Sequence, residues 1–240
     1  MKFEKYINEL QENGFSVIGN IYTDQEINEM ASCLEHANQH SNSFMKTKDL
    51  FAIRQLIVHI PSLKKPLFNS KMMELISTFS ESDYFLTKAI YFDKPSASNW
   101  FVAYHQDLSI SVKEKVDLNQ FKNWTYKKGQ YGVQPPLEIL EDTITVRIHL
   151  DKTDTGNGAL RVIPKSHLHG IIRSDSNDWN RESEIVCDVE KGGAMLMKPL
   201  TLHASKRTTN RKQRRVIHLE FNKHLLPKPL QWLEYFNPKD

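Results

Sequence analysis

The sequence predicts a mainly β protein with flanking helices, built as an antiparallel sandwich or barrel. Helical periodicity is confined to roughly the first 80 of the 240 residues. Several short strand-like segments follow between residues 84 and 221, separated by clusters of Pro, Gly, Asn and Asp rather than by helices. No GxGxxG or GxxxxGK motif occurs, which excludes the phosphate-binding Rossmann and P-loop folds.

The N-terminal part is predicted to be a helical cover. Helices are expected over residues 3–13, from residue 23 onward and over residues 70–79, with a short strand at 15–18. Gly14 ends the first helix, because glycine readily adopts the left-handed conformation found after a helix. Thr23 and Glu26 form a Thr-x-x-Glu capping box at the start of the second helix.

The predicted strands form the core. They cover residues 84–92, 100–110, 143–150, 159–163, 185–189, 194–197 and 214–221. A long segment that is rich in Lys, Gln, Asn and aromatic residues interrupts them, and such a segment is typical of a lid, a binding loop or disorder. We therefore expect a single domain over residues 1–240, with 1–80 as mostly helical cover, 84–222 as the β core and 111–141 as a candidate lid.

Composition narrows the functional classes. The formal charge of +3 is too small to indicate a nucleic-acid partner. No apolar run is long enough to span a bilayer, and the first fifteen residues lack the apolar stretch of a signal peptide. Cys33 and Cys187 lie far apart, which excludes a zinc ribbon and a disulfide scaffold and is typical of a reducing compartment. We expect a cytoplasmic protein that acts on a small molecule, with neither nucleic acid nor membrane as partner.

His105 and Asp107 are candidate metal ligands. Residues two apart on a strand project from the same face, so this pair offers an imidazole nitrogen and a carboxylate oxygen side by side. A facial metal triad needs one more donor. His203, on a turn after an apolar strand, lies 96 residues beyond Asp107, and a rolled-up sheet can return it to a neighbouring strand. The alternative is a half-buried strand with polar residues facing solvent.

Arg214 is a candidate anion-binding residue at the start of the last strand. Alternation divides that strand into a mostly polar face, Arg214, Val216, His218 and Glu220, and a mostly apolar face, Arg215, Ile217, Leu219 and Phe221. If the polar face turns inward, Arg214 is the inward guanidinium, and its planar fork suits a carboxylate. The alternative is that both arginines are ordinary basic residues at a strand start.

Together these motifs resemble the phytanoyl-CoA dioxygenase family of iron(II)- and 2-oxoglutarate-dependent oxygenases, over roughly residues 84–222. The blocks are, in order, Asp93-Lys-Pro95, His105-Gln-Asp107, Thr155-Gly-Asn-Gly-Ala-Leu160, Val162-Ile-Pro-Lys-Ser-His167, His203-Ala-Ser205 and Arg214. Lys165 stands where the family typically has glycine. The resemblance implies a double-stranded β-helix barrel of the jelly-roll or cupin-like type, with the N-terminal helices packed outside.

The resemblance also implies a metal centre and a reaction. His105, Asp107 and His203 would hold Fe(II), and the enzyme would use 2-oxoglutarate and O2 to hydroxylate an unidentified small molecule while forming succinate. Halogenating relatives have a small residue at the position of Asp107, which leaves a coordination site for chloride. A carboxylate there implies oxygenation rather than halogenation.

The cosubstrate and substrate contacts are further implied. Arg214 would pair with the distal carboxylate of 2-oxoglutarate, and Ser205 would add a hydroxyl hydrogen bond nearby. Arg147 falls on the inward strand position that often lines the cosubstrate pocket in this family, although arginine is less usual there. Lys88, on the strand leading to the His105 strand, is a candidate substrate contact.

Two other functional classes stay open. A zinc or other metal-dependent hydrolase could use the same His and Asp residues, but Arg214 would then lack an obvious purpose. A non-catalytic small-ligand-binding protein could keep the barrel and use its cavity for capture alone.

Overall fold

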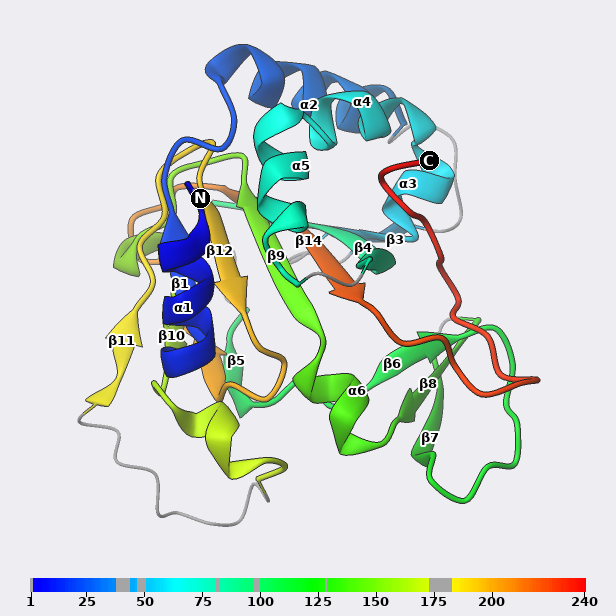
Figure 1. The fold of residues 1–240 in the computed structure, drawn as a ribbon. Coiled ribbons are helices and arrows are strands. Elements are labelled where there is room, and N and C mark those ends of the chain that lie inside the picture. The colour runs from blue at the N-terminus through cyan, green and yellow to red at the C-terminus, as the bar shows by residue number, and fades with distance from the viewer. Residues whose placement is uncertain are drawn as a thin grey trace.

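The fold is mostly β structure, with helices covering one face of its main sheet (Figure 1). The computed structural model describes residues 2–37, 44–46, 51–80, 83–96, 100–127, 129–172 and 183–240. The main sheet has seven strands, in the spatial order β1 (Phe15–Ile18), β12 (Ala194–Met197), β9 (Ile144–His149), β14 (Arg214–Asn222), β4 (Phe85–Lys94), β3 (Phe51–Arg54) and β2 (Phe44–Lys46).

A second, smaller sheet completes the core. Its order is β11 (Ile185–Val186), β10 (Leu160–Val162), β13 (His203–Ser205) and β5 (Val102–His105). Neighbouring strands in both sheets are antiparallel. An apolar cluster joins the two sheets, formed by Leu160, Val162, Cys187, Val189, Met195 and Met197. The expected antiparallel β core with helices outside is therefore confirmed.

Helices pack on the outer face of the main sheet. They are α1 (Glu4–Asn13), α2 (Asp24–Ala37), α3 (Leu56–His59), α4 (Lys64–Leu67) and α5 (Ser70–Ser77), with the short 3-10 turn η1 (Pro61–Leu63) between α3 and α4. Two further 3-10 turns, η2 (Thr155–Asn157) and η3 (Ser166–His169), come later in the sequence, between β9 and β11. One apolar cluster unites helical residues such as Met30 and Leu75 with Ile217 and Leu219 of β14. This cluster is the hydrophobic centre that holds the helices against the sheet.

Local sequence signals set the helix ends as predicted. The backbone N–H of Thr23 donates to Glu26 Oε2 at 2.7 Å and that of Glu26 to Thr23 Oγ1 at 3.3 Å, which confirms the capping box. Gly14 has φ +84° and its N–H donates to the Leu10 carbonyl, so it ends α1. A Cβ at Gly14 would lie 2.4 Å from Thr201 Oγ1, so glycine is also required sterically.

One prediction about local structure is wrong, and one strand was missed. His203 does not lie on a turn but opens β13, whose hydrogen bonds to β5 and β10 make it a strand. Residues 51–54 were not predicted as a strand, yet β3 pairs with β4 and extends the main sheet. The run Phe51–Arg54 is too short to show alternation, so only its pairing with β4 identifies it.

The inserted segment is a small sheet rather than an irregular loop. Its strands are β6 (Ile110–Val112), β8 (Gln130–Gln134) and β7 (Lys122–Lys127), followed by α6 (Leu137–Glu141). An apolar cluster of Ile110, Val112, Phe121 and Val133 with Trp232 of the C-terminal segment holds it in place. The sequence did not show the apolar alternation expected of a strand here, because most residues of β7 are exposed and polar.

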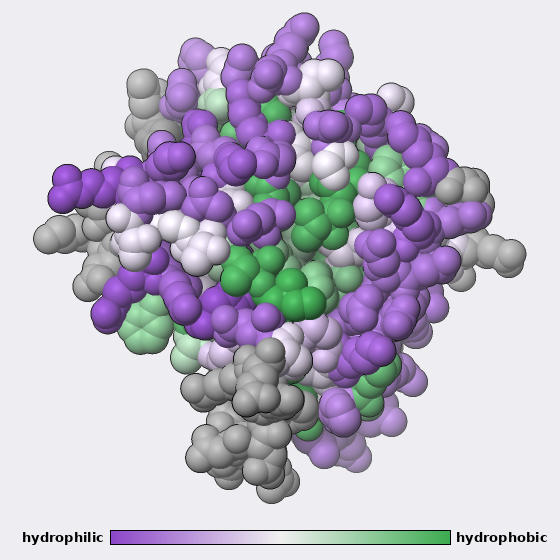
Figure 2. Space-filling model, turned by 90° about the vertical axis from the view of Figure 1, so that its left-hand side faces the viewer, coloured by the Kyte–Doolittle hydropathy of each residue, from purple (hydrophilic) through white to green (hydrophobic). Residues whose placement is uncertain are grey.

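Two further features concern the surface. The face on the left of Figure 1, where β1 and β11 lie, has an apolar centre surrounded by hydrophilic side chains (Figure 2). There, Phe15 and Val17 of β1 pack partly buried against the cluster between the sheets. Among the described residues, no helix combines the length and the apolar character that crossing a bilayer requires. Cys33 and Cys187 are both free thiols.

Candidate active site

His105, Asp107 and His203 meet at one point between the ends of β5 and β13. The antiparallel register pairs His203 directly with His105, and Asp107 follows β5 by two residues. The Nε2 atoms of His105 and His203 lie 3.7 and 3.6 Å from the two Asp107 carboxylate oxygens. One ligand atom from each residue lies within 4.8 Å of the others. The structure thus brings together the three residues that the sequence singled out.

The two imidazoles are oriented by the backbone. Nδ1 of His105 is 2.9 Å from the Ala103 carbonyl, and Nδ1 of His203 is 2.9 Å from the Thr201 carbonyl. A carbonyl only accepts, so each Nδ1 carries the proton and each Nε2 presents a lone pair. This arrangement, in which the second ring nitrogen is held by a hydrogen bond, is typical of metal-binding histidines.

The protonation states also suit a metal. Burial lowers the pKa of His203 to about 4, despite the opposing charge of Asp107, so its imidazole is neutral at neutral pH. Burial would raise the pKa of Asp107, but its electrostatic interactions with the neighbouring His203, His218, His105 and Lys88 outweigh burial and lower the pKa to about 2. Two imidazoles and one carboxylate form the donor set that binds non-haem iron(II).

The triad opens into a cavity of about 490 Å³ between the two sheets. Arg147 from β9 and Arg214 from β14 line it, together with Ser205, two residues beyond His203 on β13. Arg214, His218 and Glu220, on the mostly polar face of β14, turn inward, while Ile217 of the other face packs beneath the helices. All three residues expected near the cosubstrate therefore lie in the same cavity as the triad.

The cavity contains two buried guanidinium groups without a carboxylate partner. Arg147 is 8% and Arg214 is 5% exposed, and no carboxylate of a described residue forms an ion pair with either. Arg214 donates to the Gly158 carbonyl, and Arg147 contacts His218. Burial lowers the pKa of Arg147 to about 10, and burial with the charge of Arg147 lowers that of Arg214 to about 9. Both remain cationic at neutral pH, so this end of the cavity carries two positive charges that no described carboxylate neutralises.

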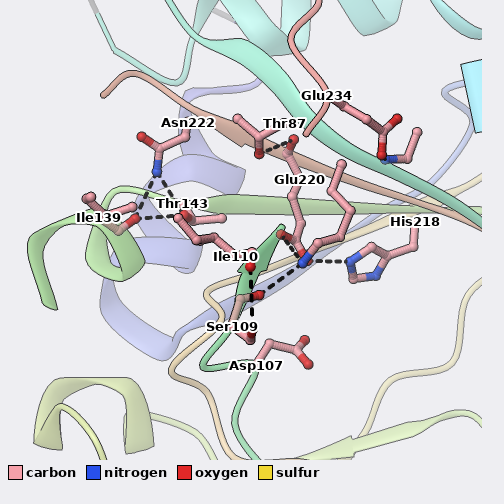
Figure 3. Close-up of polar contacts among 12 residues, drawn as sticks. Thr87, Asp107, Ser109, Ile110, Ile139, Thr143, His218, Glu220, Asn222 and Glu234 are labelled. Carbon is pink, nitrogen blue, oxygen red and sulfur yellow. Dashed lines mark hydrogen bonds and ion pairs between the residues drawn. The ribbon is translucent and has the colours of Figure 1, made fainter. Parts of the chain in front are cut away.

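Lys88 also faces the cavity, where it forms an ion pair with Glu220. Its Nζ atom lies 2.8 Å from Glu220 Oε1 and 2.7 Å from Oε2, and it donates to the Ser109 carbonyl at 3.1 Å. Figure 3 shows Glu220 and His218 pointing toward one another, with Asp107 on the same side of β14. Glu220 was predicted to face inward, but its pairing with Lys88 depends on the register of β14 against β4.

Sequence reasoning missed the cavity residue Arg54. It closes the unpredicted strand β3 and lines the cavity with Trp100, Lys127 and Tyr131. The last two come from the small inserted sheet, so that sheet forms one wall of the cavity. A basic residue that ends a short apolar run was the only available signal for Arg54.

Fold and site together define a non-haem metal enzyme of the 2-oxoglutarate-dependent class. The model of the family described as Phytanoyl-CoA dioxygenase (PhyH) matches residues 10–216. The chain therefore belongs to the phytanoyl-CoA dioxygenase family. As a member it is an oxidoreductase that depends on iron(II), 2-oxoglutarate and O2. A comparison with curated proteins finds no match.

Solved structures show the same fold. The 2-oxoglutarate-dependent epimerase SnoN from nogalamycin biosynthesis is 11% identical, with a TM-score of 0.67 over 92% of this chain and 81% of SnoN. AviO1 from Streptomyces viridochromogenes is 16% identical, with a TM-score of 0.66 over 93% and 96% of the two chains. HygX from Streptomyces hygroscopicus, solved with nickel, 2-oxoglutarate and hygromycin B, is 13% identical, with a TM-score of 0.66 over 96% and 89%.

Proposed function

We propose that the chain is a single-domain dioxygenase that hydroxylates a small molecule. The pair of buried guanidiniums beside the His-Asp-His triad carries this proposal, because 2-oxoglutarate is a dianion that chelates a metal. His105, Asp107 and His203 would hold iron(II). Arg214 would pair with the distal carboxylate of 2-oxoglutarate, with Ser205 nearby and Arg147 on the same wall.

Each protein group then has a defined task. When bound, iron and 2-oxoglutarate supply the oxidising chemistry, in which the cosubstrate is oxidised to succinate and carbon dioxide and one oxygen atom of O2 enters the substrate. The triad fixes the reaction centre at the base of the cavity, and the two arginines set the direction of the cosubstrate. With iron bound, the Asp107 carboxylate would fill the coordination site that halogenating relatives leave for chloride, so we propose oxygenation rather than halogenation.

The outer part of the cavity indicates the kind of substrate. It is lined by apolar and aromatic side chains, including Phe92, Trp100 and Tyr131, and by the basic side chains of Arg54 and Lys127. Among the described residues, neither Arg54 nor Lys127 forms an ion pair. These features support a small molecule with an apolar or aromatic body and an acidic group. Lys88, bridged to Glu220, would contact it from the inner wall.

Anaerobic titration with iron(II) and 2-oxoglutarate tests the metal and cosubstrate sites. Bidentate chelation should give a weak visible charge-transfer band in the wild type, and His203→Ala should abolish it. A metabolite screen should then find a compound that stimulates succinate release and gains one oxygen atom by mass spectrometry. Wild-type protein that shows no band and consumes no 2-oxoglutarate would instead support a hydrolase or a binding protein. A chlorinated product in the presence of chloride would contradict oxygenation.

A further inference from the structure

A chain of polar contacts crosses the inner wall of the cavity. The Arg147 guanidinium Nη1 is 2.9 Å from His218 Nδ1, and His218 Nε2 is 3.0 Å from Glu220 Oε1. Glu220 in turn holds Lys88. His218 and Glu220 are 5% and 6% exposed, so water does not replace these contacts. This series of polar contacts therefore links the Arg147 guanidinium, beside the triad, to Lys88 on β4.

The partners fix the tautomer of His218. A guanidinium only donates, so Nδ1 of His218 must accept from Arg147, and the ring proton must lie on Nε2. That proton is donated to the Glu220 carboxylate. Burial would raise the pKa of Glu220, but Lys88 and His218 outweigh it and hold the pKa below its usual value. An ionised Glu220 thus selects the one tautomer of His218 that can receive Arg147.

The Arg147 guanidinium is hydrogen-bonded at Nη1, by His218, but not at Nε. Its Nε atom is buried and has no hydrogen-bond partner in the described part of the chain. Its side chain lines the cavity together with Arg214 and the triad. A buried, unpartnered N–H of a charged group is costly, so it indicates a group that awaits an anionic ligand.

We propose that His218 and Glu220 are positioning residues for the cosubstrate. Resting on the proposed function, this inference assigns them the task of holding Arg147 so that its free edge meets a carboxylate of 2-oxoglutarate. They touch neither the cosubstrate nor the metal in this role. A buried polar chain of this kind is rarely the most stable filling for a cavity wall, whereas its directionality suits orientation of a ligand.

Two substitutions of His218 separate its contact with Arg147 from its contact with Glu220. Asparagine places an amide oxygen near the position of Nδ1, so His218→Asn keeps an acceptor for Arg147 and loses the donor to Glu220. Glutamine places an amide nitrogen near the position of Nε2, so His218→Gln keeps the donor and loses the acceptor. The dissociation constant of 2-oxoglutarate is measured by calorimetry on the Ni(II)-loaded proteins, which do not turn over.

We expect His218→Gln to raise that dissociation constant about 10- to 100-fold and His218→Asn to change it by less than about threefold. Glu220→Gln should raise it about 10-fold, because the neutral amide no longer selects the tautomer. Glu234→Gln, which alters a second buried carboxylate outside the cavity, is the matched control and should leave it unchanged. Independently, nitrogen NMR of the metal-free wild type should show His218 protonated at Nε2 only.

The proposal would be overturned if His218→Asn and His218→Gln weakened 2-oxoglutarate binding equally, or if His218 were protonated at Nδ1. Thermal unfolding of each metal-free variant identifies any that fails to fold, and the NMR result decides the tautomer without a variant. Arg147→Met separates this inference from the proposed function. If the wild type binds 2-oxoglutarate and Arg147→Met binds it equally well, the positioning role is wrong while the dioxygenase assignment stands. If the wild type does not bind 2-oxoglutarate, the proposed function itself fails.

Discussion

Replacing Arg214 by methionine tests how the two adjacent arginines of β14 divide their tasks. Arg214 turns into the cavity, where burial and Arg147 lower its pKa to about 9. A displacement of this size corresponds to roughly 5 kcal/mol against the charged guanidinium, as an upper bound. Methionine keeps an unbranched side chain and removes the charge. The substitution therefore removes a buried cation that no carboxylate of the described residues neutralises.

Arg214→Met should weaken the binding of 2-oxoglutarate rather than lower the free energy of unfolding. Truncating one partner of a buried, hydrogen-bonded charge pair costs about 2–5 kcal/mol, so the dissociation constant of 2-oxoglutarate should rise about 30- to 4,000-fold. The metal-free variant should unfold with a free energy within about 1 kcal/mol of wild type, because relief of desolvation opposes the lost hydrogen bond to Gly158.

Arg215→Met is the matched control one residue away. Arg215 points to the opposite face, where Nε and Nη2 donate to the Asp151 carboxylate at 2.9 and 2.8 Å. Its loss should lower the melting temperature and leave 2-oxoglutarate affinity within about twofold. Calorimetry on Ni(II)-loaded protein and thermal unfolding of metal-free protein measure both quantities. Unchanged affinity in Arg214→Met, or a large loss in Arg215→Met, would refute the assignment of the inward face.

Three further outcomes follow from the same structure. His203→Ala should lose metal binding and succinate formation together, because two donors do not complete a facial site; calorimetry with Ni(II) measures the first. Arg54→Gln with Lys127→Gln should raise KM at least about tenfold for an acidic substrate found by the screen, with 2-oxoglutarate affinity unchanged; an unaltered KM would contradict an acidic substrate. Burial raises the pKa of Glu234 to about 7, so the contribution of Glu234 to stability should decrease as pH rises from about 4.5 through 7. Glu234→Gln should remove that contribution, so the variant should gain stability relative to wild type over this range, by up to about 3 kcal/mol at pH 8 in urea unfolding; a stability difference that does not change with pH would be the contrary result.

Much of the core could be predicted because the relevant signals are local. Alternation along β14 depends only on the geometry of a strand, and it separated the face of Arg214 from that of Arg215, whereas the inward position of Arg147 was implied by the family resemblance. The capping box at Thr23 and the glycine after α1 act through neighbouring residues, so the helix ends were also readable.

Motif order identified the three triad residues before any geometry was known. The sequence by itself therefore determined the strand-rich class, the division of β14 into two faces and, through the family resemblance, the three candidate donors. Their convergence could not be derived from one strand, because His105 and His203 become neighbours only through the pairing of β5 with β13.

Only the tertiary structure decided what each inward residue touches. The register of β14 against β4 and β9 places Glu220 against Lys88 and His218 against Arg147. The fold also brings the unpredicted strand β3, with Arg54, and the small inserted sheet to the cavity wall. The physical reason is that strand alternation is set by adjacent residues, whereas register and sheet order are set by hydrogen bonds and packing between distant segments.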